Sequence, residues 1–333
     1  MKRKNSPRHL PRLKSREADE MSEKLHISVS PHISSPRTTQ GIMLDVVIAL
    51  MPAVIAGAVI FGLRALLVVL ASVAATVISE YIFCLITKRE NTVTDLSAVV
   101  TGILLGLNLH ANAAIWQVML GGVFAIIVVK CLFGGLGQNF ANPAITARVF
   151  LLVSFSGALA GGAVPKLSSA PDLVAGATPL AALKEGGALP SIGDMLLGLR
   201  GGAIGETCAI ALLIGFAYLL FKKVIYAEVP LVCVATVFIL SLVCDNSFSI
   251  ALYHILSGGL ILGAVFMVTD YSSTPTSRFG KMVFACGCGA MTYIIRKLGA
   301  YPEGVSFAIL LMNVLSPYID KWTAKRPFGG AKV

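Results

Sequence analysis

Apolar stretches separated by short polar breaks fill most of the chain after residue 40. Several stretches are shorter than the roughly 20 residues that a complete helical crossing of a bilayer needs. We therefore interpret 96–110 and 143–157 as half-crossing or tightly packed helices, which are stable only where protein or a cavity covers their backbone. The predicted spans are 43–62, 65–87, 96–110, 114–132, 143–157, 203–221, 227–244, 250–268, 281–297 and 303–320.

This pattern predicts an all-α polytopic membrane protein with about ten transmembrane helices. Five spans lie on each side of a long central loop. Because five is an odd number, the second group enters the membrane from the opposite side to the first, so the arrangement suggests two inverted five-helix halves. The predicted parts are a basic cytoplasmic tail at 1–40, a first membrane half at 41–157, a loop at 158–202, a second membrane half at 203–322 and a C-terminal cytoplasmic tail at 323–333.

Composition and charge placement agree with a membrane protein. Hydrophobic residues make up 56% of the chain and charged residues 13%, whereas soluble domains carry about 25% charged residues. Nine Lys or Arg fall in the first 40 residues, and others, such as Lys130, lie in the short loops of the same predicted side. This bias marks a cytoplasmic face rather than nucleic-acid binding. It predicts cytoplasmic termini, an extracytoplasmic loop 158–202, and Arg296 in an outer loop.

Seven cysteines are scattered along the chain without a CxxC pair. Cys286 and Cys288 are separated by one glycine, but no histidine or further cysteine stands nearby at metal-ligand spacing. The sequence therefore predicts no metal site.

The central loop contains a Gly/Ala-rich turn, Gly176-Ala177-Thr178, followed by Pro179 and preceded by Asp172. Composition alone indicates only a turn that presents a threonine. The proline disfavours a helical conformation at Thr178, which favours an exposed hydroxyl.

This turn resembles the flavinylation motif of the Rnf complex and of the Na⁺-translocating NADH:quinone reductase, in which FMN is joined through its phosphate to the threonine hydroxyl. Three other runs look like the same NqrB/RnfD family, which includes the D subunit of the Rnf complex, and the resemblance covers about residues 26–322. Ala175 departs from the serine frequent in relatives. The runs are Ser30-Pro-His32, Gly137-Gln-Asn-Phe-Ala-Asn-Pro143 with Arg148, and Thr269-Asp-Tyr-Ser-Ser-Thr-Pro275.

The resemblance implies a urea-channel-like bundle with covalent FMN on Thr178, within a motif that includes Asp172, Gly176 and Ala177. It further implies a multi-pass cell-membrane subunit of an ion-translocating ferredoxin:NAD⁺ oxidoreductase, and an FMN transferase that modifies it. The implied partners are the A, B, C, E and G subunits of the complex and membrane lipid. A second, non-covalent flavin and the choice between Na⁺ and H⁺ stay open. Partner subunits must bind NAD⁺ and iron–sulfur clusters, because the chain has neither fingerprint.

Acidic residues in or beside apolar segments are candidates for an ion route, since a deep carboxylate usually faces a cavity. We favour Glu80 and Asp270, followed by Glu206. For Asp45 and Asp95 we favour a position near the positive start of a helix. A channel or secondary transporter for a small solute is the alternative function.

Two further patterns are left open. Asn139 and Asn142 suit helix capping, but the start of the fifth span and Arg148 could also face an anionic flavin or an electron path. The runs 93–97 and 268–272 both read Val-Thr-Asp-x-Ser, and because their spacing does not fit a five-plus-five repeat we attribute this to coincidence or shared loop chemistry.

Overall fold

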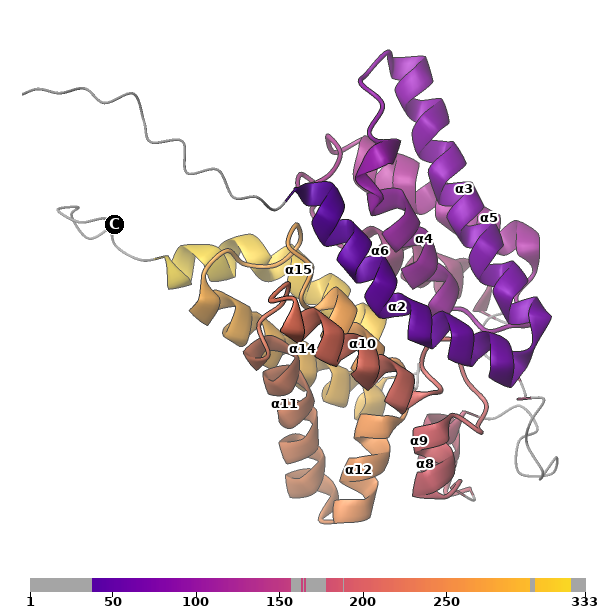
Figure 1. Cartoon of the computed structure of the whole chain (residues 1–333). Coiled ribbons are helices and arrows are strands. Elements are labelled where there is room, and N and C mark those ends of the chain that lie inside the picture. Colours follow the sequence, from indigo (N-terminus) through magenta and orange to yellow (C-terminus); the bar gives the residue numbers. More distant parts are fainter. Residues whose placement is uncertain are drawn as a thin grey trace, which may run out of the picture. The chain divides into compact units, whose positions relative to one another are not determined.

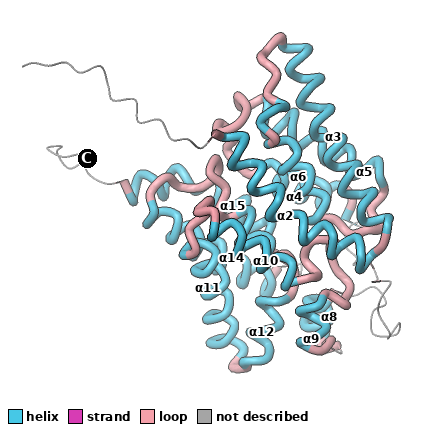
Figure 2. The backbone as a smooth tube through the Cα atoms, viewed as in Figure 1, coloured by secondary structure: helices cyan, strands magenta, loops and turns pink. Residues whose placement is uncertain are grey.

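The computed structural model describes residues 38–156, 163, 165, 178–187, 189–299 and 303–324. Residues Thr39–Val333 form one compact unit, distinct from residues 1–38. The predicted tails at 1–40 and 323–333 lie almost wholly outside the described residues. Figure 2 shows helices joined by loops, and no strand element occurs in the described part of the chain.

The first group of helices is drawn in indigo to magenta in Figure 1. Within it, α4 packs against α3 and α2, and α6 packs against α4 and η2. The elements are α2 (Thr39–Phe61), α3 (Leu63–Thr87), the 3₁₀ turn η1 (Val93–Asp95), α4 (Ser97–Leu107), α5 (Ile115–Val123), the π-helix η2 (Phe124–Cys131) that continues α5, and α6 (Pro143–Ser154).

The second group follows two short helices, α8 (Pro179–Glu185) and α9 (Ile192–Leu197), of the predicted central loop. Its helices α11 and α14 pack against each other, and α10 packs against α2 of the first group. The elements are α10 (Ala209–Phe221), α11 (Glu228–Asp245), α12 (Phe248–Leu256), α13 (Leu260–Leu262), the π-helix η4 (Gly263–Met267), α14 (Arg278–Leu298) and α15 (Val305–Thr323).

Each of the ten predicted segments contains one helix or up to three consecutive helical elements. By length and hydropathy, α2, α3 and α11 can cross a membrane, and the bent pair Phe248–Leu256 and Leu260–Met267 could make a fourth span. The prediction that two segments are short is confirmed, because α4 has 11 residues and α6 has 12. Ten crossings and two inverted halves remain predictions.

Large apolar side chains point outward from the long helices. Ile55, Val59 and Leu63 are between 57% and 68% exposed, while Leu50 and Val68 are fully buried. A soluble protein rarely exposes a continuous apolar surface, whereas lipid favours one. Together with the apolar spans, this surface identifies a membrane protein.

Glycines bring α4 close to α3. A Cβ on Gly102 would lie 2.6 Å from the Cα of Val73, and one on Gly106 would lie 2.9 Å from the Cα of Val69. These two glycines are four residues apart, the spacing that lets the backbones of membrane helices approach. The short helix α4 is therefore held against α3 by backbone proximity.

A break between α12 and α13 bends that segment by 63°. The break falls at Ser257, Gly258 and Gly259, and Gly258 has a φ of +65°, which favours glycine. The carbonyl groups at the end of α12 thus lose their helical partners inside the protein and need other donors. The side chains that supply these donors belong to the candidate site.

Candidate functional site

Thr178 is the N-cap of α8. Its backbone is extended, with φ −71° and ψ 152°, and its hydroxyl oxygen accepts a hydrogen bond from the amide of Ala181 at 3.4 Å. The side chain is only 9% exposed, so the expectation of an open hydroxyl is not met. The other residues predicted for the motif, Asp172, Gly176 and Ala177, lie outside the described residues.

Thr178 lines a small polar cavity whose walls come from distant parts of the chain. Asn108 and His110 follow α4, Arg148 projects from α6, and Glu303 precedes α15. The cavity has a volume of about 20 Å³, which is enough for one water molecule. The structure therefore places Arg148 beside the predicted flavin attachment residue.

Arg148 makes two side-chain contacts at this cavity. It donates a hydrogen bond of 2.5 Å to the Oδ1 atom of Asn108 and forms an ion pair with Glu303. The Nε atom of Arg148 has no hydrogen-bond partner among the residues that the structure describes. Because the Arg148 side chain is 5% exposed and that of Glu303 is 25% exposed, the guanidinium is the more deeply buried half of the pair.

Two further arginines bind the free carbonyl groups at the end of α12. Arg200 donates to the carbonyl of Leu256 at 2.5 Å, and Arg296 donates to the carbonyl of Ser257 at 3.0 Å. Arg200 also donates to the carbonyl of Glu206, which precedes α10, at 2.8 Å. Cations stabilise the negative end of a helix. The arginines therefore explain how a broken helix can end inside the protein.

Glu206 completes this group. Its side chain is buried, and its Oε2 atom has no hydrogen-bond partner within the described part of the chain. A Cβ built on Gly259 would lie 3.7 Å from this oxygen and 4.0 Å from a terminal nitrogen of Arg148, so the polar groups converge at the break after α12. We call Arg148, Arg200, Arg296, Glu206 and Glu303 the arginine cluster.

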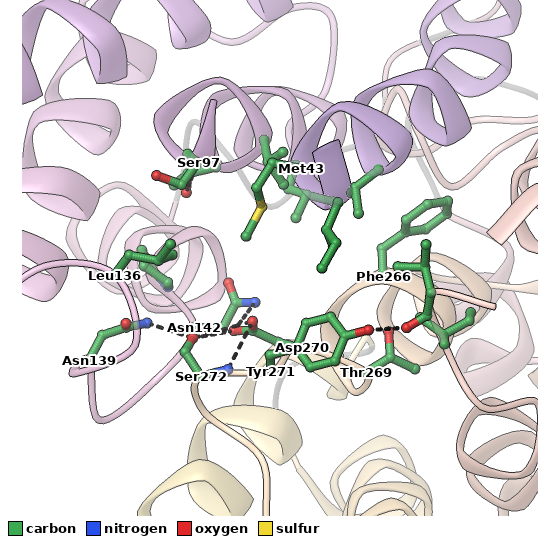
Figure 3. A pocket seen from close by; sticks show the side chains of 18 of the residues that line it. Met43, Ser97, Leu136, Asn139, Asn142, Phe266, Thr269, Asp270, Tyr271 and Ser272 are labelled. Atoms are coloured by element: carbon green, nitrogen blue, oxygen red, sulfur yellow. Dashed lines mark hydrogen bonds between the residues drawn. The ribbon is translucent and has the colours of Figure 1, made fainter. Parts of the chain in front are cut away.

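A second site, the Asp270 pocket, lies between the two groups of helices. Its volume is about 90 Å³. Figure 3 shows Asn142 and Ser272 pointing toward Asp270 at one side of this pocket. The polar residues that line it are Ser97, Thr101, Lys130, Asn139, Asn142, Thr269, Asp270, Tyr271 and Ser272.

The carboxylate of Asp270 accepts several hydrogen bonds. Its Oδ2 atom accepts from the hydroxyl of Ser273 at 2.9 Å, from the hydroxyl of Ser272 at 3.1 Å and from the amide of Asn142 at 3.3 Å. The Oδ1 atom of Asn142 meanwhile accepts from the amides of Ala144 and Ile145 and caps α6. The capping interpretation of Asn142 is thus confirmed, and the same side chain binds Asp270.

Glu80 lies next to this pocket in a buried ion pair. Lys130 donates to the Oε1 atom of Glu80 at 2.6 Å and to the hydroxyl of Ser97 at 2.7 Å. Thr92 donates to the same Glu80 oxygen at 2.6 Å. Lys130 and Ser97 also line the Asp270 pocket, so Glu80 is connected to this pocket through Lys130, while Glu206 belongs to the arginine cluster.

Sequence reasoning missed several of these relationships. Lys130 and Arg296 were expected in loops, yet both are buried inside the protein. The helix-start interpretation of Asp45 is wrong, because α2 begins at Thr39 and the Asp45 carboxylate accepts instead from Tyr218 at 2.8 Å. The repeated Val-Thr-Asp-x-Ser run was discounted, although the serine of each copy lines the Asp270 pocket.

Comparison with known proteins gives consistent matches along the chain. A sequence model of the NQR2, RnfD, RnfE family matches residues 26–329. The chain is 46% identical to the D subunit of the Na⁺-translocating ferredoxin:NAD⁺ oxidoreductase complex of Acetobacterium woodii, over 93% of this chain and 96% of that protein. It is 40% identical to the D subunit of the proton-translocating ferredoxin:NAD⁺ oxidoreductase complex of Clostridium ljungdahlii, over 91% and 96%. It is 33% identical to the D subunit of the ion-translocating oxidoreductase complex of Halorhodospira halophila, over 91% and 95%.

Proposed function

The chain belongs to the NQR2, RnfD, RnfE family, and on this premise we propose that it is the D subunit of an ion-translocating ferredoxin:NAD⁺ oxidoreductase complex, with FMN bound covalently to Thr178. The observation that carries the assignment is similarity along nearly the whole length to relatives that bear this name. Two of these relatives are named for different ions, so the family leaves the choice between Na⁺ and H⁺ open. The solute-channel alternative has no comparable support.

The surroundings of Thr178 fit an attached flavin phosphate. Thr178 shares a polar cavity with Arg148, and a guanidinium is a preferred partner for phosphate oxygens. Attachment joins the Thr178 hydroxyl oxygen to phosphorus, with loss of the hydroxyl proton and departure of the leaving group that the donor carried on phosphorus. When bound, the flavin supplies redox chemistry, and the chain supplies its position and electrostatic surroundings.

The low exposure of Thr178 bears on the order of assembly. An FMN transferase must reach the hydroxyl of a residue that is only 9% exposed. Modification therefore precedes the packing of α8 against α12, or α8 swings out while the transferase acts. The transferase is accordingly a partner on the same side of the membrane as α8, which we place outside the cell, with both chain termini in the cytoplasm.

Gel fluorescence tests the attachment. The chain is made with and without an FMN transferase and viewed under ultraviolet light on a denaturing gel. We expect a fluorescent band from wild type and a dark band from Thr178→Asn, which keeps an acceptor for the cap of α8 but has no hydroxyl.

Ser191→Ala is the matched control for this experiment, because Ser191 caps α9 as Thr178 caps α8. The control should stay fluorescent. A dark wild-type band, or a Thr178→Asn band as bright as wild type, would contradict the assignment.

The Asp270 pocket supports a second part of the proposal, an ion route on the predicted cytoplasmic side. Its volume of about 90 Å³ corresponds to about three water molecules, at roughly 30 Å³ each. Asp270 and Lys130 supply ionisable groups at its wall, and Glu80 is bound to Lys130. Deep carboxylates at cavities commonly serve ion movement. Glu206 is a further candidate, near the C-terminal end of α4.

Ion uptake into vesicles that contain the whole complex tests this route. We expect Glu80→Gln and Asp270→Asn each to slow uptake, while Glu90→Gln, at an exposed position, should match wild type. Uptake that is unchanged in both variants would remove the two residues from the route. Comparison of Na⁺ and H⁺ uptake in the same vesicles identifies the ion.

The arrangement of helices supports an inverted repeat. In the first group α3 packs against α4 and α5, and in the second group α11 packs against α12 and α14. Helices α2 and α10 meet, as do α6 and α15, so equivalent helices of the two groups pair with each other. We therefore propose that the chain crosses the membrane ten times. We also propose that its partners are the A, B, C, E and G subunits of the complex. A second, non-covalent flavin stays a prediction.

A further inference from the structure

The arginine cluster holds more positive than negative charge. Among the described residues, its three guanidinium groups face two carboxylates, which leaves one positive formal charge. Arg148, Arg200, Arg296 and Glu206 are each at most 4% exposed. The adjoining pair of Asp245 and Lys297 is neutral and changes nothing in this count. The carbonyl groups at the end of α12 carry only a partial negative charge and offset this excess only in part. A buried charge without a full partner is costly, so the described part of the site suits a further negative charge.

The hydrogen bonding of the cluster is also incomplete. Arg148 has no partner for Nε, and Arg200 has none for Nε or for one terminal nitrogen, among the described residues. Buried polar atoms in native proteins usually have partners. Among the fully buried atoms of the cluster that the structure describes, three free donors stand against one free acceptor, the Oε2 atom of Glu206. The missing group is therefore an acceptor, which agrees with the missing negative charge.

A flavin esterified to a threonine through its phosphate supplies both properties. Two ester bonds leave the phosphorus with two non-bridging oxygens that share one negative charge. That charge equals the excess of the cluster, and both oxygens accept hydrogen bonds from a planar guanidinium. Thr178, Arg148 and Glu303 line the same cavity, so the ester would lie beside these two members of the cluster.

We propose that the arginine cluster is the counter-ion of the flavin phosphodiester, and that Arg148 is the positioning residue that binds it. This inference rests on the proposed attachment of FMN to Thr178. Binding of the phosphodiester displaces the Glu303 carboxylate from Arg148. The Glu303 side chain is 25% exposed, so the carboxylate can turn toward solvent and release one edge of the Arg148 guanidinium to the phosphate. Arg200 and Arg296 stay bound to the end of α12.

Neutralisation of a buried charge by the phosphodiester should stabilise the loaded chain. The test measures the melting temperature of the full chain purified after expression with and without an FMN transferase. The difference between the two temperatures is the loading increment. Mass spectrometry of the tryptic peptide 167–184 gives the loaded fraction of each sample, so that increments are compared at equal loading.

We expect a positive increment in wild type and a smaller one in Arg148→Gln, because the cluster then has no excess charge. Arg148→Lys should recover part of the increment. Glu303→Gln should enlarge it, since this change raises the excess charge and frees Arg148. Lys321→Gln removes an exposed cation at the opposite end of α15 from Glu303 and should leave the increment at the wild-type value.

Equal increments in wild type, Arg148→Gln and Glu303→Gln would overturn the inference while leaving the attachment intact. If Arg148→Gln fails to fold, the opposite sign predicted for Glu303→Gln still decides the matter. Absence of FMN from the wild-type peptide would overturn the attachment and, with it, this inference. The two failures are thus distinguished by the mass of one peptide.

Discussion

Lys130 donates a hydrogen bond of 2.6 Å to Glu80, and the two side chains are 3% and 1% exposed. The pair joins η2 to α3, and the contact of Lys130 with Ser97 extends it to the start of α4. Each charge alone would be expensive in this position, so each depends on the other. The pair therefore fixes the place where three helices meet beside the Asp270 pocket.

Removing one member of the Glu80–Lys130 ion pair should lower the free energy of unfolding more than replacing both members. We expect Lys130→Met to lower the free energy of unfolding by about 3–5 kcal/mol, because it leaves the Glu80 carboxylate buried without its partner. The double variant Glu80→Gln with Lys130→Met should recover a large part of that loss. Unfolding in detergent, followed for the wild type and the single and double variants, measures the coupling. Additive losses would show that the two charges act independently.

The contact between α4 and α3 gives a second expectation. A Cβ on Gly102 would lie 2.6 Å from the backbone of Val73, so Gly102→Ala must push the helices apart. We expect a loss of about 1–3 kcal/mol in the free energy of unfolding, as for other overpacked sites. Gly193→Ala is the control, since the nearest atom to its Cβ is 3.7 Å away.

The control should be neutral or more stable by up to about 1 kcal/mol, because alanine is the better helix former. Thermal unfolding of both variants under the same conditions makes the comparison. Equal stability of Gly102→Ala and wild type would mean that α4 does not approach α3 so closely.

Much of this fold is visible in the sequence. Hydropathy gives ten segments because each segment is rich in apolar residues and short polar stretches separate most of them. The break at Gly258 lies inside the predicted span 250–268 and is not visible in hydropathy. The capping role of Asn142 follows from its position before a proline. Such features depend on neighbouring residues, and local rules describe them well.

The arginine cluster and the ion pair beside the Asp270 pocket cannot be recognised from the sequence in the same way. Lys130 pairs with a residue 50 positions away, and Arg296 reaches the end of α12. Charge counting assigns both to loops, since it records only how near a cation is to the end of an apolar segment. Packing decides whether that cation turns inward. The burial of Thr178 likewise depends on elements outside its own loop.

The pH dependence of stability tests the setting of Asp270. Burial raises the pKa of Asp270 above its ordinary value, although hydrogen bonds from Ser273 and Ser272 oppose this effect. The folded state therefore prefers the protonated carboxyl. Its contribution to stability is complete below the unfolded pKa of about 3.9 and is lost as pH rises through the folded pKa.

Melting curves of wild type and Asp270→Asn across this pH range make the measurement. The stability of wild type relative to the variant should fall as pH rises above about 4 and then level off. A relative stability that rises with pH would mean that the hydrogen bonds outweigh burial and hold the carboxyl ionised.

The central claim is that Thr178 carries a flavin. Mass spectrometry of the tryptic peptide 167–184, from the chain isolated in its native complex, tests it most directly. We predict the mass of the peptide plus one FMN joined with loss of water, with fragment ions that place the addition on Thr178. An unmodified peptide in complexes that are active in electron transfer would contradict the account.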